Sequence, residues 1–133
     1  MKILIADDDD HNRTVLLGML AGYGECDVVV TGKEAFEAFV MAHDDKQPYE
    51  LICLDIMMPE MDGNEALKRM REFEEELGRD VLVREAKIVM TTALNQQSDI
   101  VNAYYKGGCT AYLIKPISKK AVVETLKDIG LLN

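Results

Sequence analysis

Short runs of apolar residues alternate along the chain with longer segments in which apolar residues recur every three or four positions. The runs lie at residues 2–6, 26–30, 51–54, 87–91 and 111–114. Runs of this length between Gly, Pro and Asp predict strands, and a run that is apolar throughout, such as 51–54, is typical of a strand covered on both faces. Strands that alternate with helices imply right-handed crossovers, so we predict an α/β fold with a doubly wound, five-stranded parallel sheet.

The helical pattern occurs in five segments. They lie at about residues 12–21, 33–43, 64–77, 98–106 and from Ser118 onwards. Thr31 and Glu34 form a capping-box pattern ahead of the second helix, and Ser98 and Ser118 are suitable N-caps for the last two. The charged residues of the third helix predict a solvated outer face. Residues 79–85 fit either a helical turn or a packed loop.

Polar side chains follow four of the five predicted strands. They are Asp7 and Asp8 after the first strand, Asp55 at the end of the third, Thr92 after the fourth and Lys115 after the fifth. Parallel strands end at the same edge, and open α/β sheets bind ligands in the crevice outside these carboxyl ends. We therefore expect the five side chains to share one rim, to which the second strand adds no comparable group.

This set of residues favours phosphoryl transfer to Asp55. Two carboxylates about 4 Å apart repel each other by roughly 4 kcal/mol at an effective dielectric constant near 20, so their pKa values rise or a hard divalent cation binds among them. Mg²⁺ needs only one or two carboxylates and keeps waters that a phosphoryl oxygen can replace. Lys115 and the Thr92 hydroxyl could then contact other phosphoryl oxygens. Each residue alone is common at protein surfaces, and only the joint arrangement favours this chemistry.

Length and charge narrow the class of protein. The chain of 133 residues suits one domain spanning 1–133, and its net charge of −9 opposes direct binding to nucleic acid. The first residues are too few and too acidic for a signal peptide, and no apolar run approaches membrane-spanning length, so we expect a cytoplasmic protein without membrane insertion.

The cysteines and histidines lack metal-ligand spacing. Cys26, Cys53 and Cys109 lie far apart within apolar segments and are expected to be reduced core residues. His11 and His43 are expected at the surface.

Four motifs together resemble the receiver domain of bacterial two-component response regulators. In chain order they are DDDDHNR after the first strand, LDIMMPEMDG, TTA and YLIKPIS. The resemblance covers almost the whole chain and implies a flavodoxin-like (βα)₅ fold with strand order 2-1-3-4-5.

The resemblance also implies a role for each matching residue. Asp55 would be the phosphoacceptor. Asp7 and Asp8 would bind Mg²⁺ together with Asp55 and the backbone carbonyl of Met57. Thr92 would be the switch hydroxyl, Tyr112 the aromatic side chain that changes rotamer, and Lys115 the phosphate-contacting lysine. A sensor histidine kinase or phosphotransfer protein would donate the phosphoryl group. The fourth helix, fifth strand and fifth helix would then control a downstream protein, with Tyr104 and Tyr105 as candidate contacts in the surface 98–126.

Two departures from the family pattern concern the surroundings of the site. Asp10 stands where many members have proline, and the segment between Asp55 and Thr92 is longer than in compact receivers, mostly at 74–85.

Met57 and Leu94 stand at positions that in the family face the path of the attacking water, where apolar side chains cannot orient that water. We therefore expect slow hydrolysis of the phosphorylated form.

Two other classes of protein share features of this sequence. A haloacid-dehalogenase-like phosphatase also uses a strand-end aspartate, but it needs a second acid two positions later, where Met57 stands. A phosphorylation-independent binding module with the same fold is the other alternative. We expect the chain to promote only its own phosphorylation and dephosphorylation, and therefore not to act as an enzyme on other substrates. We expect a receiver with no output domain after Asn133, and the same sequence would equally suit one domain of a longer regulator.

Overall fold

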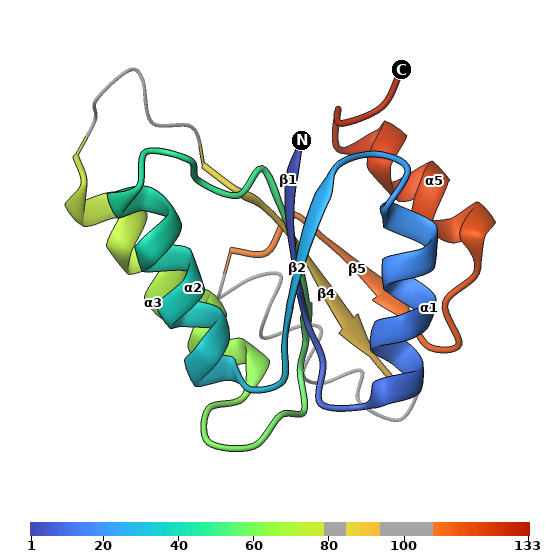
Figure 1. Cartoon of the computed structure of the whole chain (residues 1–133), viewed down its shortest axis with the longest axis horizontal. Helices are drawn as coiled ribbons and strands as arrows, with labels where there is room; N and C mark the ends of the chain where they lie inside the picture. Colours follow the sequence, from blue (N-terminus) through green and yellow to red (C-terminus); the bar gives the residue numbers. More distant parts are fainter. Residues whose placement is uncertain (79–84, 94–107) are drawn as a thin grey trace.

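A computed structural model describes residues 1–78, 85–93 and 108–133. These residues form a parallel sheet of five strands in the order β2-β1-β3-β4-β5 (Figure 1). The strands are β1 (Lys2–Ala6), β2 (Glu25–Val29), β3 (Leu51–Asp55), β4 (Lys87–Thr92) and β5 (Ala111–Ile114). The predicted fold class and strand order are therefore confirmed.

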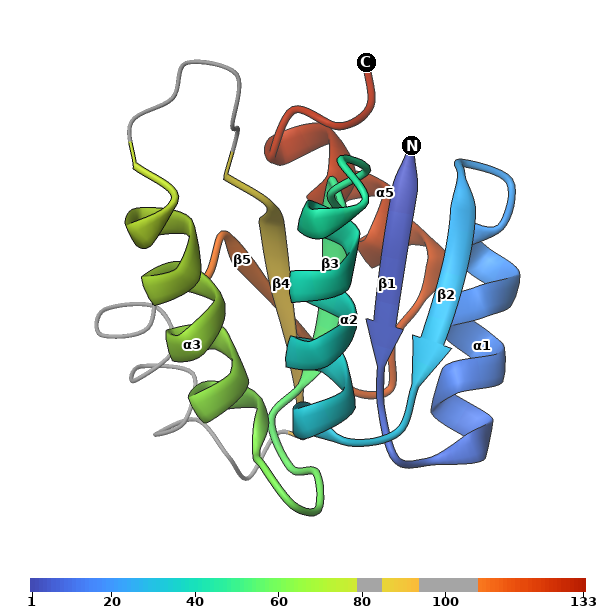
Figure 2. The same cartoon turned by 60° about the vertical axis from the view of Figure 1, so that its left-hand side comes forward.

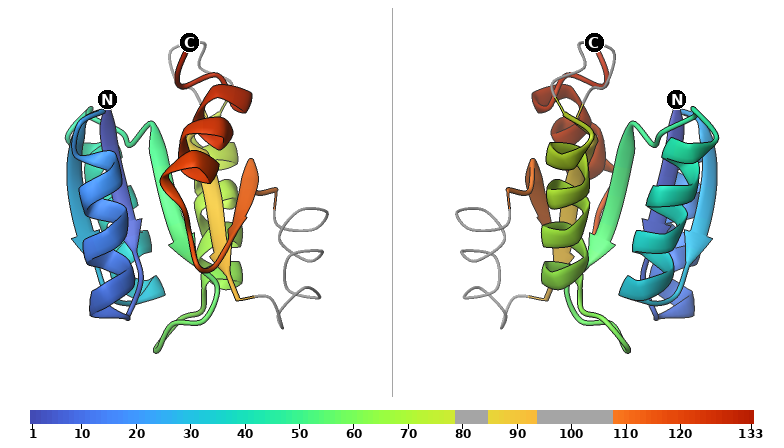
Figure 3. Two further views of the ribbon diagram at one scale, coloured as in Figure 1. Left: turned by 90° about the vertical axis from the view of Figure 1, so that its right-hand side faces the viewer. Right: turned by 90° about the vertical axis from the view of Figure 1, so that its left-hand side faces the viewer.

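Helices cover both faces of the sheet. Those within the described ranges are α1 (Asp10–Leu20), α2 (Gly32–Asp44), α3 (Gly63–Glu76) and α5 (Lys119–Asp128). Figure 2 shows α2 and α3 side by side on one face, and Figure 3 shows α1 and α5 together on the other. The helix predicted at 98–106 lies outside the described residues. Both termini lie at the amino-terminal edge of the sheet, opposite the loop that follows β3 (Figure 1).

Strand β3 lies in the middle of the sheet and is buried along its whole length. Its side chains alternate between two hydrophobic clusters: Ile52 and Leu54 pack with α2 and α3, whereas Leu51 and Cys53 pack with α1 and α5. Full burial of a large apolar side chain contributes about 1.5–3 kcal/mol. This anchoring holds Asp55, the last residue of β3, at a defined place on the carboxyl edge.

Side-chain caps start the helices close to where the sequence predicts them. The Thr31 hydroxyl accepts a hydrogen bond from the Glu34 amide at 3.0 Å, and the Ser118 hydroxyl accepts one from the Ala121 amide at 3.1 Å. Helix α1 begins at Asp10 rather than residue 12, because the carboxylate of Asp9 caps it. Strand β2 covers 25–29 rather than 26–30, because its pairing with β1 begins at Lys2 opposite Glu25.

His43 is only half-exposed, rather than the fully surface residue that the sequence predicts. Its ring lies 4.7 Å from that of Phe39 and 5.5 Å from that of Phe73, between α2 and α3, and burial lowers its pKa. Cys53 and Cys109 are buried as predicted, but Cys26 is only half-buried because β2 is an edge strand. All three are free thiols.

The prediction of a solvated outer face on α3 is wrong at two of its charged residues, Arg71 and Glu74. The Arg71 Nη1 donates to the Glu74 Oε1 at 2.6 Å, and the Glu74 side chain is 5% exposed. The other Glu74 oxygen accepts from the Ala86 amide at 2.7 Å. Arg71 also donates to the carbonyls of Ala86 and Gly108, at 2.9 and 3.0 Å. These backbone groups precede β4 and β5 and need partners once α3 covers them.

Candidate functional site

Three carboxylates meet at the carboxyl edge of the sheet. Asp7 and Asp8 follow β1, Asp55 ends β3, and each offers an oxygen within 4.8 Å of those of the other two. Asp7 is 0% exposed and Asp55 is 5% exposed, whereas Asp8 faces solvent. The predicted grouping of these acids is therefore present, with two buried members and one open to ligands.

Lys115 reaches the same cluster from the segment after β5. Its Nζ lies 3.1 Å from the Asp7 Oδ2 and 3.1 Å from the Asp55 Oδ1. Its backbone amide donates to the carbonyl of Thr92 at 2.7 Å, which holds the start of the β5–α5 connection against the end of β4. One ammonium group thus bridges two carboxylates, one directly after β1 and one at the end of β3.

The charges at this site are unevenly balanced. Burial, followed by the nearby charge of Asp7, raises the pKa of Asp55 to about 6, although Lys115 acts in the opposite direction. Burial acts to lower the pKa of Lys115, but the charges of Asp55 and Asp7 and its hydrogen bonds to them outweigh burial, so the net shift is upward. The site therefore holds a fully charged lysine and a carboxylate whose ionisation is disfavoured.

Backbone contacts fix Asp7 in place. Its Oδ1 accepts from the Asp9 amide at 2.9 Å, and its own amide donates to the Val29 carbonyl at 3.2 Å. The Arg13 Nη1 donates to the Asp7 carbonyl at 2.9 Å, and the same guanidinium pairs with Asp10. Sequence reasoning missed Arg13. The only available signal was its place on the first turns of the helix after the acidic block.

The loop between β3 and α3 folds back onto the carboxyl end of β3. The Gly63 amide donates to the Ile56 carbonyl at 2.7 Å, and a Cβ on Gly63 would lie 2.1 Å from the Asp55 carbonyl oxygen. Glycine is therefore required for this close approach. Met57 lies in the same loop with its side chain 56% exposed.

The other predicted residues lie at different depths. Thr92 is completely buried at the end of β4, and its hydroxyl donates to the Ala93 carbonyl at 3.2 Å. Tyr112 is 42% exposed on β5, which is an edge strand among the described residues. Leu94, Tyr104 and Tyr105 lie outside the described residues.

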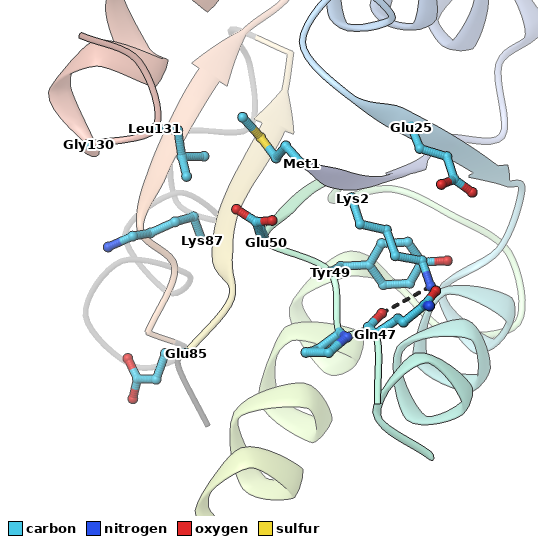
Figure 4. A pocket seen from close by; sticks show the side chains of 11 residues that line it. Met1, Lys2, Glu25, Gln47, Tyr49, Glu50, Glu85, Lys87, Gly130 and Leu131 are labelled. Atoms are coloured by element: carbon cyan, nitrogen blue, oxygen red, sulfur yellow. Dashed lines mark hydrogen bonds between the residues drawn. The ribbon is translucent and has the colours of Figure 1, made fainter. Parts of the chain in front are cut away.

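A separate cavity, which Figure 4 shows from close by, opens at the amino-terminal edge of the sheet. It has a volume of about 640 Å³ and is bordered by Met1, Tyr49 and Leu131. The Lys2 Nζ donates to the Gln47 carbonyl at 3.0 Å and lies 4.9 Å from the centre of the Tyr49 ring. Acidic and basic side chains both line this cavity, and it contains none of the residues of the carboxylate site.

A doubly wound parallel sheet with buried acids and a lysine at its carboxyl edge defines a class of flavodoxin-like α/β proteins that bind charged ligands at that edge. The sequence profile of the response regulator receiver domain matches residues 3–127. The chain therefore belongs to this family, whose members are the phosphoacceptor switches of two-component signalling systems.

Individual relatives agree with this assignment. The chain is 33% identical to the chemotaxis protein CheY of Listeria monocytogenes over 127 residues, which is 96% of each protein. It also resembles the receiver domain of a Saccharomyces cerevisiae response regulator, solved in complex with a histidine phosphotransfer signalling protein, with a TM-score of 0.82 and 28% identity over 98% of this chain and 88% of that one.

A third relative was solved with ligands. It is the receiver domain of a histidine kinase from Arabidopsis thaliana in complex with Mg²⁺ and BeF₃⁻, with a TM-score of 0.78 and 27% identity over 96% of this chain and 88% of that one. Within the described ranges of the present chain, no helix is long and apolar enough to cross a membrane.

Proposed function

We propose that Asp55 is the phosphoacceptor of this receiver. The observation that carries the proposal is the position of its carboxylate, which is 5% exposed at the end of the central strand, next to Asp7 and 3.1 Å from the Lys115 ammonium. A raised pKa and a charged partner in a ligand-binding crevice are typical of a functional carboxylate.

In the proposed step, a carboxylate oxygen of Asp55 attacks the phosphorus of a phosphohistidine. The new O–P bond forms as the P–N bond breaks, and the donor imidazole keeps the electron pair and takes up a proton. Lys115 would move from the carboxylates to a phosphoryl oxygen, and the Thr92 hydroxyl would donate to another, which neutralises the added charge.

Asp7, Asp8 and Asp55, with the backbone carbonyl of Met57, would hold a magnesium ion. Their oxygens match the ligand preference of Mg²⁺, and the three carboxylates lie within one ion's reach of each other. A bound magnesium ion would supply positive charge that offsets the repulsion among the acids and the charge of a phosphoryl group. Asp8, as the exposed member of the group, keeps the site open to an ion from solvent.

The phosphorylated state would signal through a change in shape. A hydrogen bond to a charged group contributes about 1.5–3 kcal/mol, so one that forms in only one of two states shifts their ratio about tenfold or more. Thr92 belongs to β4, which pairs with β5, and Tyr112 of β5 lies at the surface. We infer that Tyr112 reports the change to a downstream protein on the surface that includes β5 and α5.

The partners follow from the same role. We infer a sensor histidine kinase or phosphotransfer protein as donor, because a relative was solved with such a protein. The chain would catalyse only its own phosphorylation and dephosphorylation, act in the cytoplasm as one domain, and not bind nucleic acid, in keeping with a net charge of −9.

Intact-mass measurement after treatment with acetyl phosphate and Mg²⁺ tests the proposal. We expect the mass of one phosphoryl group on the parent chain and none on Asp55→Asn. Phosphorylation of Asp55→Asn at Asp7, Asp8 or a hydroxyl would refute the assignment of the acceptor. A parent chain that gained no mass from either acetyl phosphate or a phosphorylated histidine donor would instead be a phosphorylation-independent binding module.

A further inference from the structure

Thr91 carries a buried hydroxyl next to the proposed phosphoacceptor. The residue is 1% exposed, and its Oγ1 has no hydrogen-bond partner in the part of the chain that the structure describes. A buried unpaired hydroxyl lowers stability, and valine would fill the same space without that cost. The hydroxyl therefore needs an explanation beyond packing.

The pairing of the strands places Thr91 beside Asp55. The two residues are partners across the β3–β4 ladder, and the Thr91 carbonyl accepts from the Ile56 amide at 3.1 Å. Paired residues on parallel strands project to the same face of the sheet. The pair before them on this face, Cys53 and Val89, packs with α1 and α5.

Lys115 reaches across this same part of the sheet. On its other side, Thr91 pairs with Leu113 of β5, and Lys115 follows Leu113 by two residues. From there its Nζ reaches the Asp55 Oδ1 at 3.1 Å. Thr91 therefore stands on the strand that Lys115 crosses to hold Asp55.

Phosphorylation would leave a buried acceptor next to this donor. When the Asp55 Oδ2 bears the phosphoryl group and Lys115 turns towards the added charge, the Asp55 Oδ1 loses its ammonium contact. A carbonyl oxygen has two lone pairs, so it can accept from a hydroxyl on its buried side while a cation binds the other side. Donor and acceptor would each be unpaired on adjacent strands without this bond.

We propose that Thr91 is a second hydroxyl of the site, which donates a hydrogen bond to the unesterified carboxyl oxygen of Asp55 in the phosphorylated state. Thr91 is then a positioning residue for the acyl group, whereas Thr92 contacts the phosphoryl oxygens. This inference rests on the proposed role of Asp55.

Binding of BeF₃⁻, a phosphoryl analogue, tests the proposal at equilibrium. The full chain and the variants Thr91→Val and Thr91→Ser are titrated with BeF₃⁻ in excess Mg²⁺, with ¹⁹F NMR and calorimetry as readouts. We expect Thr91→Val to bind BeF₃⁻ roughly tenfold more weakly, the typical effect of leaving one buried acceptor without its donor, and Thr91→Ser to bind like the parent. Without ligand, Thr91→Val should melt at a higher temperature than the parent. Thr125→Val on α5 is the matched control and should leave BeF₃⁻ affinity unchanged.

Several outcomes would overturn the proposal. Equal BeF₃⁻ affinity for Thr91→Val and the parent would show that the Thr91 hydroxyl makes no hydrogen bond to the liganded site. An equal loss of affinity in Thr91→Ser would show that the shape of the side chain, and not its hydroxyl, determines affinity. A lower melting temperature of unliganded Thr91→Val would mean that the hydroxyl is already satisfied in the resting protein. Asp55→Asn tests the proposed role of Asp55 separately from that of Thr91. If Asp55→Asn still bound BeF₃⁻ like the parent, the proposed function itself would fail, whatever Thr91 does.

Discussion

Two buried carboxylates lie at opposite edges of the same sheet and have opposite surroundings. Near the amino ends of β4 and β5, Glu74 accepts from the Arg71 guanidinium at 2.6 Å and from the Ala86 amide at 2.7 Å. At the carboxyl edge, Asp55 lies beside two further acids, and one lysine is shared between it and Asp7.

The difference separates a structural site from a functional one. The charge of Glu74 is balanced by one cation, and both of its oxygens are hydrogen-bonded, so removing a partner can only weaken the fold. The carboxylates around Asp55 outnumber their one lysine, and burial, followed by the charge of Asp7, raises the pKa of Asp55 to about 6. A site that costs stability in the resting protein is suited to binding a cation and a phosphoryl group.

The largest expected effect is on the structural side of this comparison. Arg71→Leu should lower the free energy of unfolding by about 3–5 kcal/mol, because it leaves Glu74 as a buried charge without its cation. Urea denaturation of the parent and the variant measures the change. Arg69→Leu is the control: its ion pair with Glu65 has side chains 50% and 46% exposed, so a change of less than about 1 kcal/mol is expected. Equal losses in the two variants would contradict the assignment.

Replacing Asp55 should change the free energy of unfolding in the opposite direction. Asp55→Asn should raise the free energy of unfolding by about 2 kcal/mol at neutral pH without Mg²⁺, because it removes a carboxylate whose ionisation is disfavoured by burial and by Asp7. The same urea experiment tests this, with the exposed Glu37→Gln on α2 as control. A destabilised Asp55→Asn would mean that Lys115 more than offsets the burial and repulsion.

Magnesium should stabilise the folded chain at the carboxyl edge and leave the Arg71–Glu74 site unaffected. At a concentration ten times its dissociation constant, an ion that binds only the folded chain stabilises it by about 1.4 kcal/mol. We expect the melting temperature of the parent to rise in Mg²⁺ and that of Asp8→Asn to rise less. Arg71→Leu should keep the full Mg²⁺ response if it remains folded. A parent melting temperature that does not respond to Mg²⁺ would remove the basis for a metal site.

Mild acid should have a smaller effect of the same sign as Asp55→Asn. The pKa of Asp55 is raised in the folded chain, so protonation favours folding, and this contribution is lost as the pH rises through about 6. From pH 7.5 to pH 5.5 the parent should therefore gain about 0.8 kcal/mol relative to Asp55→Asn. The comparison cancels the opposing effect of His43, whose lowered pKa favours unfolding in acid. A constant difference between the two proteins over this range would contradict the raised pKa.

The smallest expected effect concerns the lifetime of the phosphorylated form. Met57 is 56% exposed beside the site, and asparagine there could orient the attacking water. Met57→Asn should shorten the lifetime about threefold, within the range of single positioning effects, and adding Leu94→Glu should shorten it further. Loss of the phosphorylated mass with time measures both. Unchanged decay in the double variant would show that these side chains do not control access of water.

Much of this protein could be predicted from the order of its residues. Apolar runs of four or five residues mark strands wherever both faces are covered, and the residue after each run marks the strand end. Asp55 and Lys115 were therefore predictable as members of one rim, because all parallel strands end at the same edge. The Thr31 cap was equally local, since it depends on residues three positions apart.

Only the tertiary structure decided which polar groups lost their water. The helical period indicates the buried face of α3, but whether Arg71 and Glu74 at its border are covered depends on the backbone groups that precede β4 and β5. In the same way, the register between β3 and β4 sets Thr91, rather than Thr92, opposite Asp55. Contacts of this kind join residues far apart in the chain, and their energies depend on burial, which no local pattern of residues encodes.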